Sequence, residues 1–160
     1  EDSHTAKRIK EYDESKIKLM IEMIKRLISR KIHFDYILAD SWFACAEVIK
    51  FVTSRHVKCH YLGMIKMGKT KYHYNRKDYT AKALVALFDH PKFSRNLGCY
   101  YVTMDVEFAG RKVRLFFTKR NKKSEWNALI TTNTELELSI HQHLKTIPLY
   151  IFLFRYLPFE

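Results

Sequence analysis

The chain lacks the cysteine pattern of small secreted proteins and of structural zinc sites. Its three cysteines are odd in number, widely spaced and form no Cys-x-x-Cys pair: Cys45, Cys59 and Cys99. This pattern argues against a disulfide framework and favours a reducing intracellular compartment. Cys59-His60 and His141-x-His143 place soft metal ligands near one another, but structural zinc sites use paired ligands at tight spacing. We therefore predict buried thiols and surface histidines.

Long hydrophobic runs are also missing. The run Leu149–Phe154 is far too short to cross a bilayer, which takes roughly 20 apolar residues, so we expect no membrane partner. The amino terminus is charged and carries no apolar segment typical of a signal peptide. Because the chain opens on Glu1 without an initiator methionine, we expect a fragment of a longer protein.

Acidic residues are few compared with basic ones. Lys and Arg total 29 against 17 Asp and Glu, which gives a formal charge of +12 and a pI of about 9.6. A domain this basic is expected to bind a polyanion, most commonly nucleic acid. The alternative is a solvated basic surface that only maintains solubility, and charge alone does not separate the two. The 47% hydrophobic content of the 160 residues favours one folded domain.

The first half of the chain alternates helix and strand patterns. A helix is predicted over Asp13–Arg30, after a frayed segment that ends at Tyr12. The evidence is a stripe of apolar residues at helical spacing: Ile17, Met20, Ile21, Ile24, Leu27 and Ile28. A strand over 37–40, a helix over 44–52 and a strand over 57–65 follow. This order predicts an α/β fold with parallel strands and crossover connections.

The second half is rich in strand patterns. Residues 72–79 resemble a small hairpin, and Thr80 is placed to cap a short helix. Apolar residues alternate over 102–108 and again over 113–117, on either side of Ala109-Gly110, which indicates a hairpin with one buried face. A further strand is predicted over 126–131, and residues 135–145 have a helical pattern that Pro148 ends.

Asp40 follows a short apolar run and precedes Ser41-Trp42-Phe43. The bounded run predicts a strand buried on both faces, and chemistry in open α/β sheets collects at the carboxyl ends of such strands. An ordinary interpretation is that Asp40 caps the next helix, as Ser41 could equally do. The segment Ala39-Asp40-Ser41-Trp42-Phe43, however, resembles the DDE transposases of bacterial insertion sequences, most closely the insertion-sequence-four type, in which the second catalytic acid stands in this context.

This resemblance implies a partial RNase H-like α/β core with a β-rich insertion. It predicts a transposase catalytic domain over 1–133, with the insertion at about 66–125, and a degenerate, frameshifted tail over 134–160. The family helix with Tyr, Arg and the third acid at positions 0, 3 and 7 has no match, because Tyr150, Arg155 and Glu160 are spaced 0, 5 and 10 and Pro158 interrupts them. The first acid would precede Glu1.

The resemblance also implies a reaction and its partners. The intact family cuts and joins transposon DNA by phosphoryl transfer that uses Mg²⁺ or Mn²⁺, and Asp40 would be both a catalytic residue and a metal ligand. Because one carboxylate cannot hold two ions, we expect this chain to be inactive and to bind no metal alone. The expected partner is DNA, both transposon ends and target, in the bacterial cytoplasm near the nucleoid, and the intact enzyme could form an oligomer.

Two basic zones are candidate phosphate contacts. The first zone is a predicted loop followed by Trp126 and contains Lys119, Arg120, Lys122 and Lys123. The second zone has Tyr72 and Tyr74 interleaved and contains Lys66, Lys69, Lys71, Arg76 and Lys77. Trp126 could stack on a base, although a core position is favoured. The remaining carboxylates, Asp78, Asp89, Asp105 and Glu107, are predicted to be solvated. The alternative function is a non-enzymatic, basic nucleic-acid-binding module on an RNase H-like scaffold.

Overall fold

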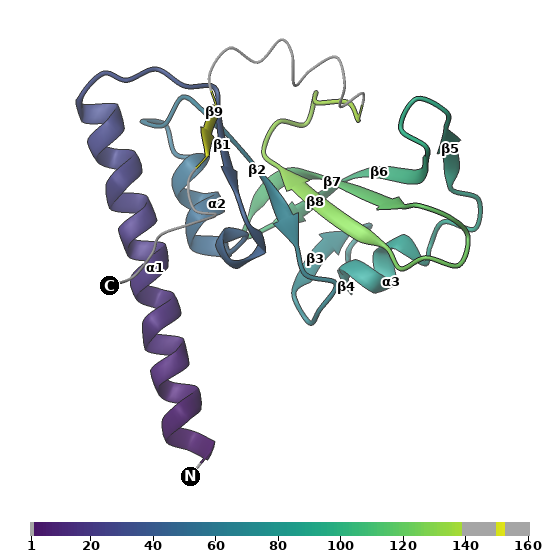
Figure 1. Ribbon diagram of the computed structural model, residues 1–160, viewed down its shortest axis with the longest axis horizontal. Helices are drawn as coiled ribbons and strands as arrows, with labels where there is room; N and C mark the ends of the chain where they lie inside the picture. The colour runs from purple at the N-terminus through teal and green to yellow at the C-terminus, as the bar shows by residue number, and fades with distance from the viewer. Residues whose placement is uncertain (1, 139–149, 153–160) are drawn as a thin grey trace.

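The computed structural model describes residues 2–138 and 150–152, with side chains described over 16–138. Within these residues, one mixed sheet of nine strands has the order β4-β3-β6-β7-β8-β2-β1-β9, and β5 pairs with β6 outside this path. The β1–β2 and β1–β9 pairs are parallel, and the other pairs are antiparallel. The helices of the first 52 residues lie beside the parallel part (Figure 1). The predicted α/β class is confirmed.

The first helix, α1 (Asp2–Ser29), begins well before the predicted start at Asp13. The segment up to Tyr12 is helical rather than frayed. Ala6, Lys7, Arg8, Lys10 and Glu11 favour a helix, and no Gly or Pro interrupts the backbone. The predicted apolar stripe is confirmed, since Met20 and Ile24 are completely buried. In Figure 1 the amino-terminal half of α1 extends beyond the sheet.

The parallel part of the sheet contains the strand predicted before Asp40. β1 (Tyr36–Ala39) pairs with β2 (His60–Ile65), with Ala39 opposite Gly63. Burial on both faces holds only for the first half of β1, because Leu38 and Ala39 are half-buried. A short 3₁₀ turn, η1 (Ser41–Phe43), and the helix α2 (Ala46–Val52) connect the two strands.

A close backbone approach explains the glycine inside β2. A Cβ atom at Gly63 would lie 2.6 Å from the Ala39 carbonyl oxygen and 2.6 Å from the Tyr61 hydroxyl. Real side chains do not tolerate such contacts, so Gly63 allows β1 and β2 to pair at this point.

The β-rich part is built from two hairpins with tight turns. β3 (Lys71–Tyr74) and β4 (Lys77–Thr80) are joined by Asn75 and Arg76, with φ values of 47° and 66°. β6 (Cys99–Phe108) and β7 (Arg111–Lys119) are joined by Ala109 and Gly110, with φ values of 54° and 70°. Two successive positive φ values are typical of the two-residue turn that matches strand twist. Both predicted hairpins are confirmed.

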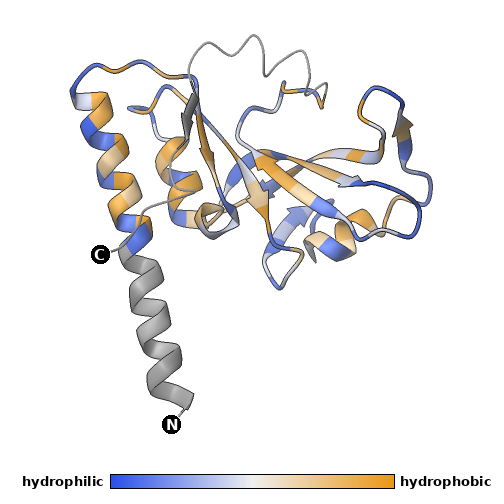
Figure 2. Cartoon of the chain, viewed as in Figure 1, coloured by the Kyte–Doolittle hydropathy of each residue, from blue (hydrophilic) through white to orange (hydrophobic). Residues whose placement is uncertain are grey.

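Three further elements complete this part. Thr80 caps α3 (Ala81–Val85) as predicted, since its Oγ1 accepts a hydrogen bond from the Ala83 N–H at 3.2 Å. β8 (Asn127–Thr131) joins β7 to β2. The short strand β5 (Lys92–Ser94) was not predicted, because three residues show no recognisable period. Figure 2 shows apolar residues along β1, β2 and β8 and hydrophilic residues in the loops.

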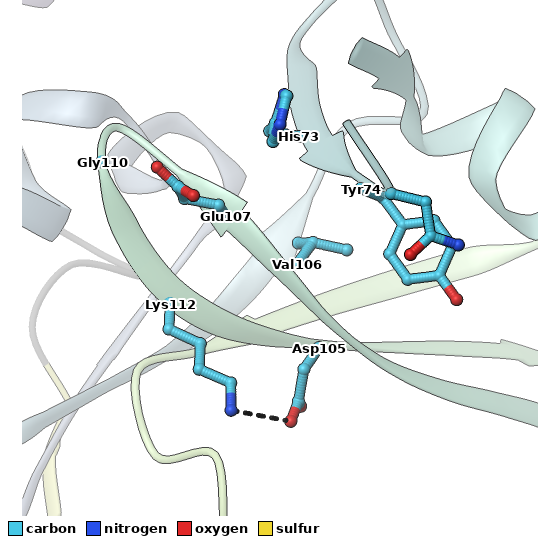
Figure 3. A pocket seen from close by; sticks show the side chains of 8 residues that line it. His73, Tyr74, Asp105, Val106, Glu107, Gly110 and Lys112 are labelled. Atoms are coloured by element: carbon cyan, nitrogen blue, oxygen red, sulfur yellow. Dashed lines mark ion pairs between the residues drawn. The ribbon is translucent and has the colours of Figure 1, made fainter. Parts of the chain in front are cut away.

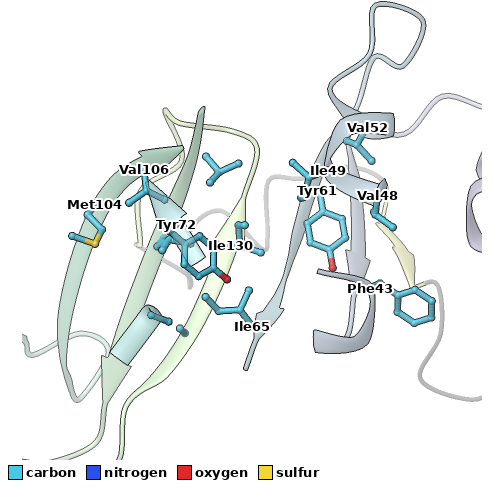
Figure 4. Close-up of a cluster of buried hydrophobic side chains, with 14 of the residues drawn as sticks. Phe43, Val48, Ile49, Val52, Tyr61, Ile65, Tyr72, Met104, Val106 and Ile130 are labelled. Atoms are coloured by element: carbon cyan, nitrogen blue, oxygen red, sulfur yellow. The ribbon is translucent and has the colours of Figure 1, made fainter. Parts of the chain in front are cut away.

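One hydrophobic core runs through both parts of the sheet. Its members come from α1, α2 and most strands, and the largest completely buried side chains include Tyr61, Phe117, Ile130 and Leu115. Figure 4 shows Ile65, Ile130 and Tyr72 between the parallel strands and the β6–β7 hairpin. No helix among the described residues is long and apolar enough to span a membrane.

The tail contributes one strand. β9 (Tyr150–Phe152) lies parallel to β1, with Ile151 opposite Ile37, so regular structure occurs where little was expected. The predicted helix over 135–145 is not present in its first residues, 135–138, which form a turn and irregular backbone. Its remainder, together with Arg155 and Glu160, lies outside the described residues. The proposed division at residue 133 stays a prediction.

Candidate nucleic-acid interface

Asp40 lies immediately after the carboxyl end of β1, as predicted, and is exposed. Its Oδ1 atom accepts a hydrogen bond from the Ser41 N–H at 2.6 Å, and Asp40 is the N-cap of η1. The capping interpretation is therefore realised, but it occupies only one carboxylate oxygen. The second oxygen can still bind a ligand at this edge of the sheet.

The described residues do not by themselves fit a magnesium site. Mg²⁺ requires octahedral coordination by oxygen ligands, usually with more than one group besides water. No cluster of three or more His, Cys, Asp or Glu side chains with metal-binding spacing occurs in residues 16–138. Asp40 and its described neighbours therefore do not supply the ligand set of a two-ion site.

The first basic zone forms an ordered, exposed loop between β7 and β8. The Asn121 Oδ1 atom accepts hydrogen bonds from the N–H groups of Lys123 and Ser124, both at 2.9 Å. This side-chain turn fixes the loop backbone, while Arg120, Lys122 and Lys123 are exposed. None of these three is ion-paired to a described carboxylate, so their charges are available to a polyanion.

Trp126 packs against the core, as favoured from the sequence, and is half-buried. The Lys119 ammonium lies 4.5 Å from the centre of its ring. A cation over the indole face adds a modest electrostatic attraction. Trp126 therefore supports the loop rather than presenting a free stacking surface.

The second basic zone spans the end of β2 and the β3–β4 hairpin. Lys66 and Lys69 follow β2, whereas Lys71, Arg76 and Lys77 belong to the β3–β4 hairpin at the other end of the strand order. All five are exposed. The zone therefore continues from the end of β2 into the hairpin that follows it directly in the chain.

The strand register brings Asp40 and the first basic zone to the same end of the sheet. β1 and β2 run in parallel with Ala39 opposite Gly63, and Ile65 at the end of β2 is opposite Ala128 near the start of β8. Asn127 is opposite Thr118, next to Lys119. The sheet edge just beyond these pairs therefore carries Asp40, Lys66 and the 119–126 loop.

Trp42 is a residue of this edge that the sequence reasoning did not select. Its side chain is 52% exposed, whereas its neighbour Phe43 is buried. The Lys66 ammonium lies 3.6 Å from the ring centre, and the Lys16 ammonium of α1 lies 5.9 Å from it. An aromatic residue after one parallel strand and a lysine after the next was the signal that could have identified this pair.

A separate pocket lies between the β3–β4 and β6–β7 hairpins (Figure 3). It is lined in part by His73, Tyr74, Asp105 and Glu107. Asp105, predicted to be only solvated, instead accepts two hydrogen bonds from Arg114, at 2.7 and 3.2 Å. These bonds lower the pKa of Asp105 below its ordinary value. The pocket is therefore part of the cross-strand scaffold, remote in strand order from Asp40.

Asp78, Cys59 and His60 were also interpreted from the sequence. Asp78, also predicted to be solvated, contacts His73 Nδ1 at 2.8 Å. Cys59 is half-buried, and burial raises the pKa of its thiol to about 12, which makes it a poor metal ligand. His60 is exposed, as predicted, and its ring lies 5.5 Å from that of Tyr36. His141 and His143 lie outside the described residues.

Comparison with known proteins yields little similarity. No protein-family model matches the chain, and no curated protein sequence matches it. A solved structure with a related arrangement is the cryo-EM structure of a piggyBac transposase synaptic complex with hairpin DNA. The sequences are 14% identical with a TM-score of 0.42, and the match covers 80% of this chain and 25% of that chain. This likeness carries no functional conclusion, which has to come from the side chains.

Proposed function

We propose that this chain is part of the catalytic domain of a DDE transposase of bacterial insertion sequences, of the insertion-sequence-four type. The observation that carries the proposal is the position of Asp40. It is exposed just after a parallel strand, in the Ala39–Phe43 segment that resembles the family, and it lies at the sheet edge that also carries the basic 119–123 loop. Asp40 is the second metal-binding acid in this proposal.

The activity of the chain alone follows from its carboxylates. In-line phosphoryl transfer by this family needs several acids to hold two divalent ions, and the resemblance supplies only Asp40. We therefore expect the 160 residues alone to bind DNA without cleaving it. Strand-cleavage assays with Mg²⁺ or Mn²⁺ on labelled duplex DNA test this expectation, because any cleavage abolished by Asp40→Ala would contradict it.

DNA binding is proposed to occur through phosphate contacts of the exposed basic loop. Lysine and arginine side chains that neutralise phosphates release counterions, so affinity falls steeply as salt increases. No helix-turn-helix or zinc-finger pattern offers base readout. We therefore expect weak binding to duplex DNA without sequence preference.

Fluorescence anisotropy with a labelled 20-base-pair duplex across a salt series tests this binding. Changing Lys119, Arg120, Lys122 and Lys123 together to Gln should reduce the slope of log affinity against log salt by up to about 3.6, because each phosphate contact contributes roughly 0.9. Asp40→Ala should leave the slope unchanged and bind equally well or slightly better, because a negative charge is removed.

A matched control removes the same charge from the opposite end of the sheet. The exposed residues Arg26, Arg30, Lys31 and Lys58 lie near the amino-terminal ends of β1 and β2. Changing these four to Gln should alter the slope by less than about one contact's share. Equal effects of the two sets would show that only net charge matters, and the absence of binding at low salt would contradict the DNA-binding proposal.

The alternative, a basic nucleic-acid-binding module without enzymatic ancestry, predicts the same salt dependence. The neighbouring DNA, read in all frames, separates the two. A transposase should have a strand containing Asp encoded upstream and a Tyr-x-x-Arg-x-x-x-Glu segment encoded downstream, in the same or a shifted frame. Their absence from both flanks would favour the module.

A further inference from the structure

The strongest unassigned feature of the surface is Trp42. With 52% of its side chain exposed, it is among the most exposed large hydrophobic residues of the described chain, although it lies between Asp40 and the buried Phe43. The other tryptophan, Trp126, packs against the core. Exposing an indole ring to water forgoes the stabilisation that its burial would provide, so its position here is notable.

Two lysine side chains from separate elements lie near the Trp42 ring. Lys66 follows β2, and its ammonium lies 3.6 Å from the ring centre. Lys16 belongs to α1, and its ammonium lies 5.9 Å from the same centre. Lys66 has no ion pair with a described carboxylate. The site therefore combines a flat aromatic surface with cationic charge.

These two properties match one chemical class of ligand. A nucleotide has a flat base that stacks on an aromatic ring and a phosphate that attracts an ammonium group. The contact of Lys66 with an exposed ring is a weak attraction, so its flexible side chain can exchange the ring for a phosphate at little cost. A base within a duplex is already stacked on both faces, so the ring selects unpaired nucleotides.

We propose that Trp42 and Lys66 form a binding site for an unpaired nucleotide of DNA, with the base on the indole ring and the phosphate on the Lys66 ammonium. The inference deepens the proposed function, on which it rests, by adding single-stranded DNA as a ligand beside Asp40. It assigns the stacking role to Trp42 and not to Trp126, for which the sequence already favoured a core position.

The direct test uses the fluorescence of Trp42. A Trp126→Phe variant contains Trp42 as its one tryptophan, so quenching reports on that ring alone. Titration with an unlabelled oligothymidylate of eight nucleotides should quench this fluorescence, whereas a blunt duplex of equal phosphate concentration should quench it much less. Similar quenching by both, or quenching by neither, would overturn the site.

Affinity measurements provide the second test. Stacking one base on an aromatic ring is worth roughly 5- to 150-fold in affinity, so Trp42→Ala should weaken oligothymidylate binding at least about fivefold and duplex binding less than twofold. Trp42→Phe keeps an aromatic surface and should retain much of the affinity. Lys66→Gln should reduce the salt slope for the single strand by about 0.7.

Phe93 offers a control for exposed aromatic rings. Its side chain is also 52% exposed, but it lies on β5 opposite Tyr100, at the Lys119 end of β7 and not beside Asp40. Phe93→Ala should leave single-strand affinity unchanged, and equal losses from Trp42→Ala and Phe93→Ala would overturn the assignment.

If duplex binding is normal but Trp42→Ala has no effect on single strands, this site is wrong and the proposed function stands. If neither DNA form binds at low salt, the proposed function itself fails. Circular dichroism of each variant confirms that the fold is retained.

Discussion

Removing the Tyr61 hydroxyl is expected to stabilise the folded chain, although most substitutions in a core destabilise it. The Tyr61 side chain is completely buried, and its hydroxyl has no hydrogen-bond partner among the described residues. Burying an unsatisfied hydroxyl costs about 1–3 kcal/mol. Tyr61→Phe removes this cost and leaves a void the size of one oxygen atom, which loses roughly 0.5 kcal/mol of packing contacts. We therefore expect the free energy of unfolding to rise by about 0.5–2.5 kcal/mol.

The same substitution on the neighbouring strand is the matched control. The Tyr36 hydroxyl accepts a hydrogen bond from Asn133 Nδ2 at 2.6 Å. Tyr36→Phe removes this bond, so it should lower the free energy of unfolding by about 0.5–1.5 kcal/mol. One chemical change should thus have opposite effects on stability at two positions.

Urea unfolding followed by circular dichroism measures both variants. The urea concentrations at the unfolding midpoint should shift in opposite directions for the two variants. The slope of the unfolding free energy against urea concentration should stay constant. In a chain of this size, 1 kcal/mol corresponds to a change in Tm of about 2–4 °C. A Tyr61→Phe variant less stable than the parent chain would show that the hydroxyl has a partner, and the reasoning would be refuted.

Three further substitutions test the sheet as a whole. Ala109 has a positive φ of 54° that disfavours residues with a Cβ, so Ala109→Asn, which creates the preferred Asn-Gly turn, should raise stability by about 0.5–1 kcal/mol in urea unfolding; a loss would contradict the turn geometry. Gly63→Ala should destabilise the chain by about 1–3 kcal/mol, because the new methyl group meets the Ala39 carbonyl oxygen; an unchanged midpoint would mean that β1 and β2 are not so close. Asp105→Asn should lower stability at neutral pH by about 1–2 kcal/mol. The pKa of Asp105 is lower in the folded chain than its ordinary value of 3.8, so its stabilisation is present above that value and is lost as the pH falls below it. Unfolding measured from pH 6 to pH 2 should therefore show a shallower acid decline in Asp105→Asn than in the parent chain, and parallel declines would refute the role of this ion pair.

The elements that the sequence predicted well are those with one buried face. In β6, Val102, Met104 and Val106 are buried and Thr103 and Glu107 are exposed, and this alternation is visible in the residues themselves. The stripe on α1 was equally clear. The strands β5 and β9 have three residues each and no such period, so local patterns could not reveal them.

The interface was only partly predictable, because its contacts depend on register. The position of Asp40 followed from the end of an apolar run. The contact between Trp42 and Lys66 requires parallel pairing of β1 and β2, which places two strand ends together. The Asp105–Arg114 pair could have been predicted more readily from the sequence, because the two-residue turn at Ala109-Gly110 fixes which residues of β6 and β7 face each other.

The antiparallel attachment of β2 to β8 has a consequence for the order in which the chain folds. The β6–β7 hairpin is closed by a two-residue turn, and hairpins of this kind form in about 1–10 μs. By contrast, the hydrogen bond from the Tyr61 N–H to Thr132 Oγ1 joins residues 71 positions apart, and such distant pairings form slowly because a long loop must close first. During synthesis α1, β1 and β2 emerge before β8 exists, at about 5–20 residues per second. The segment that carries Asp40 and Trp42 is therefore synthesised several seconds before β8, the strand that pairs with β2.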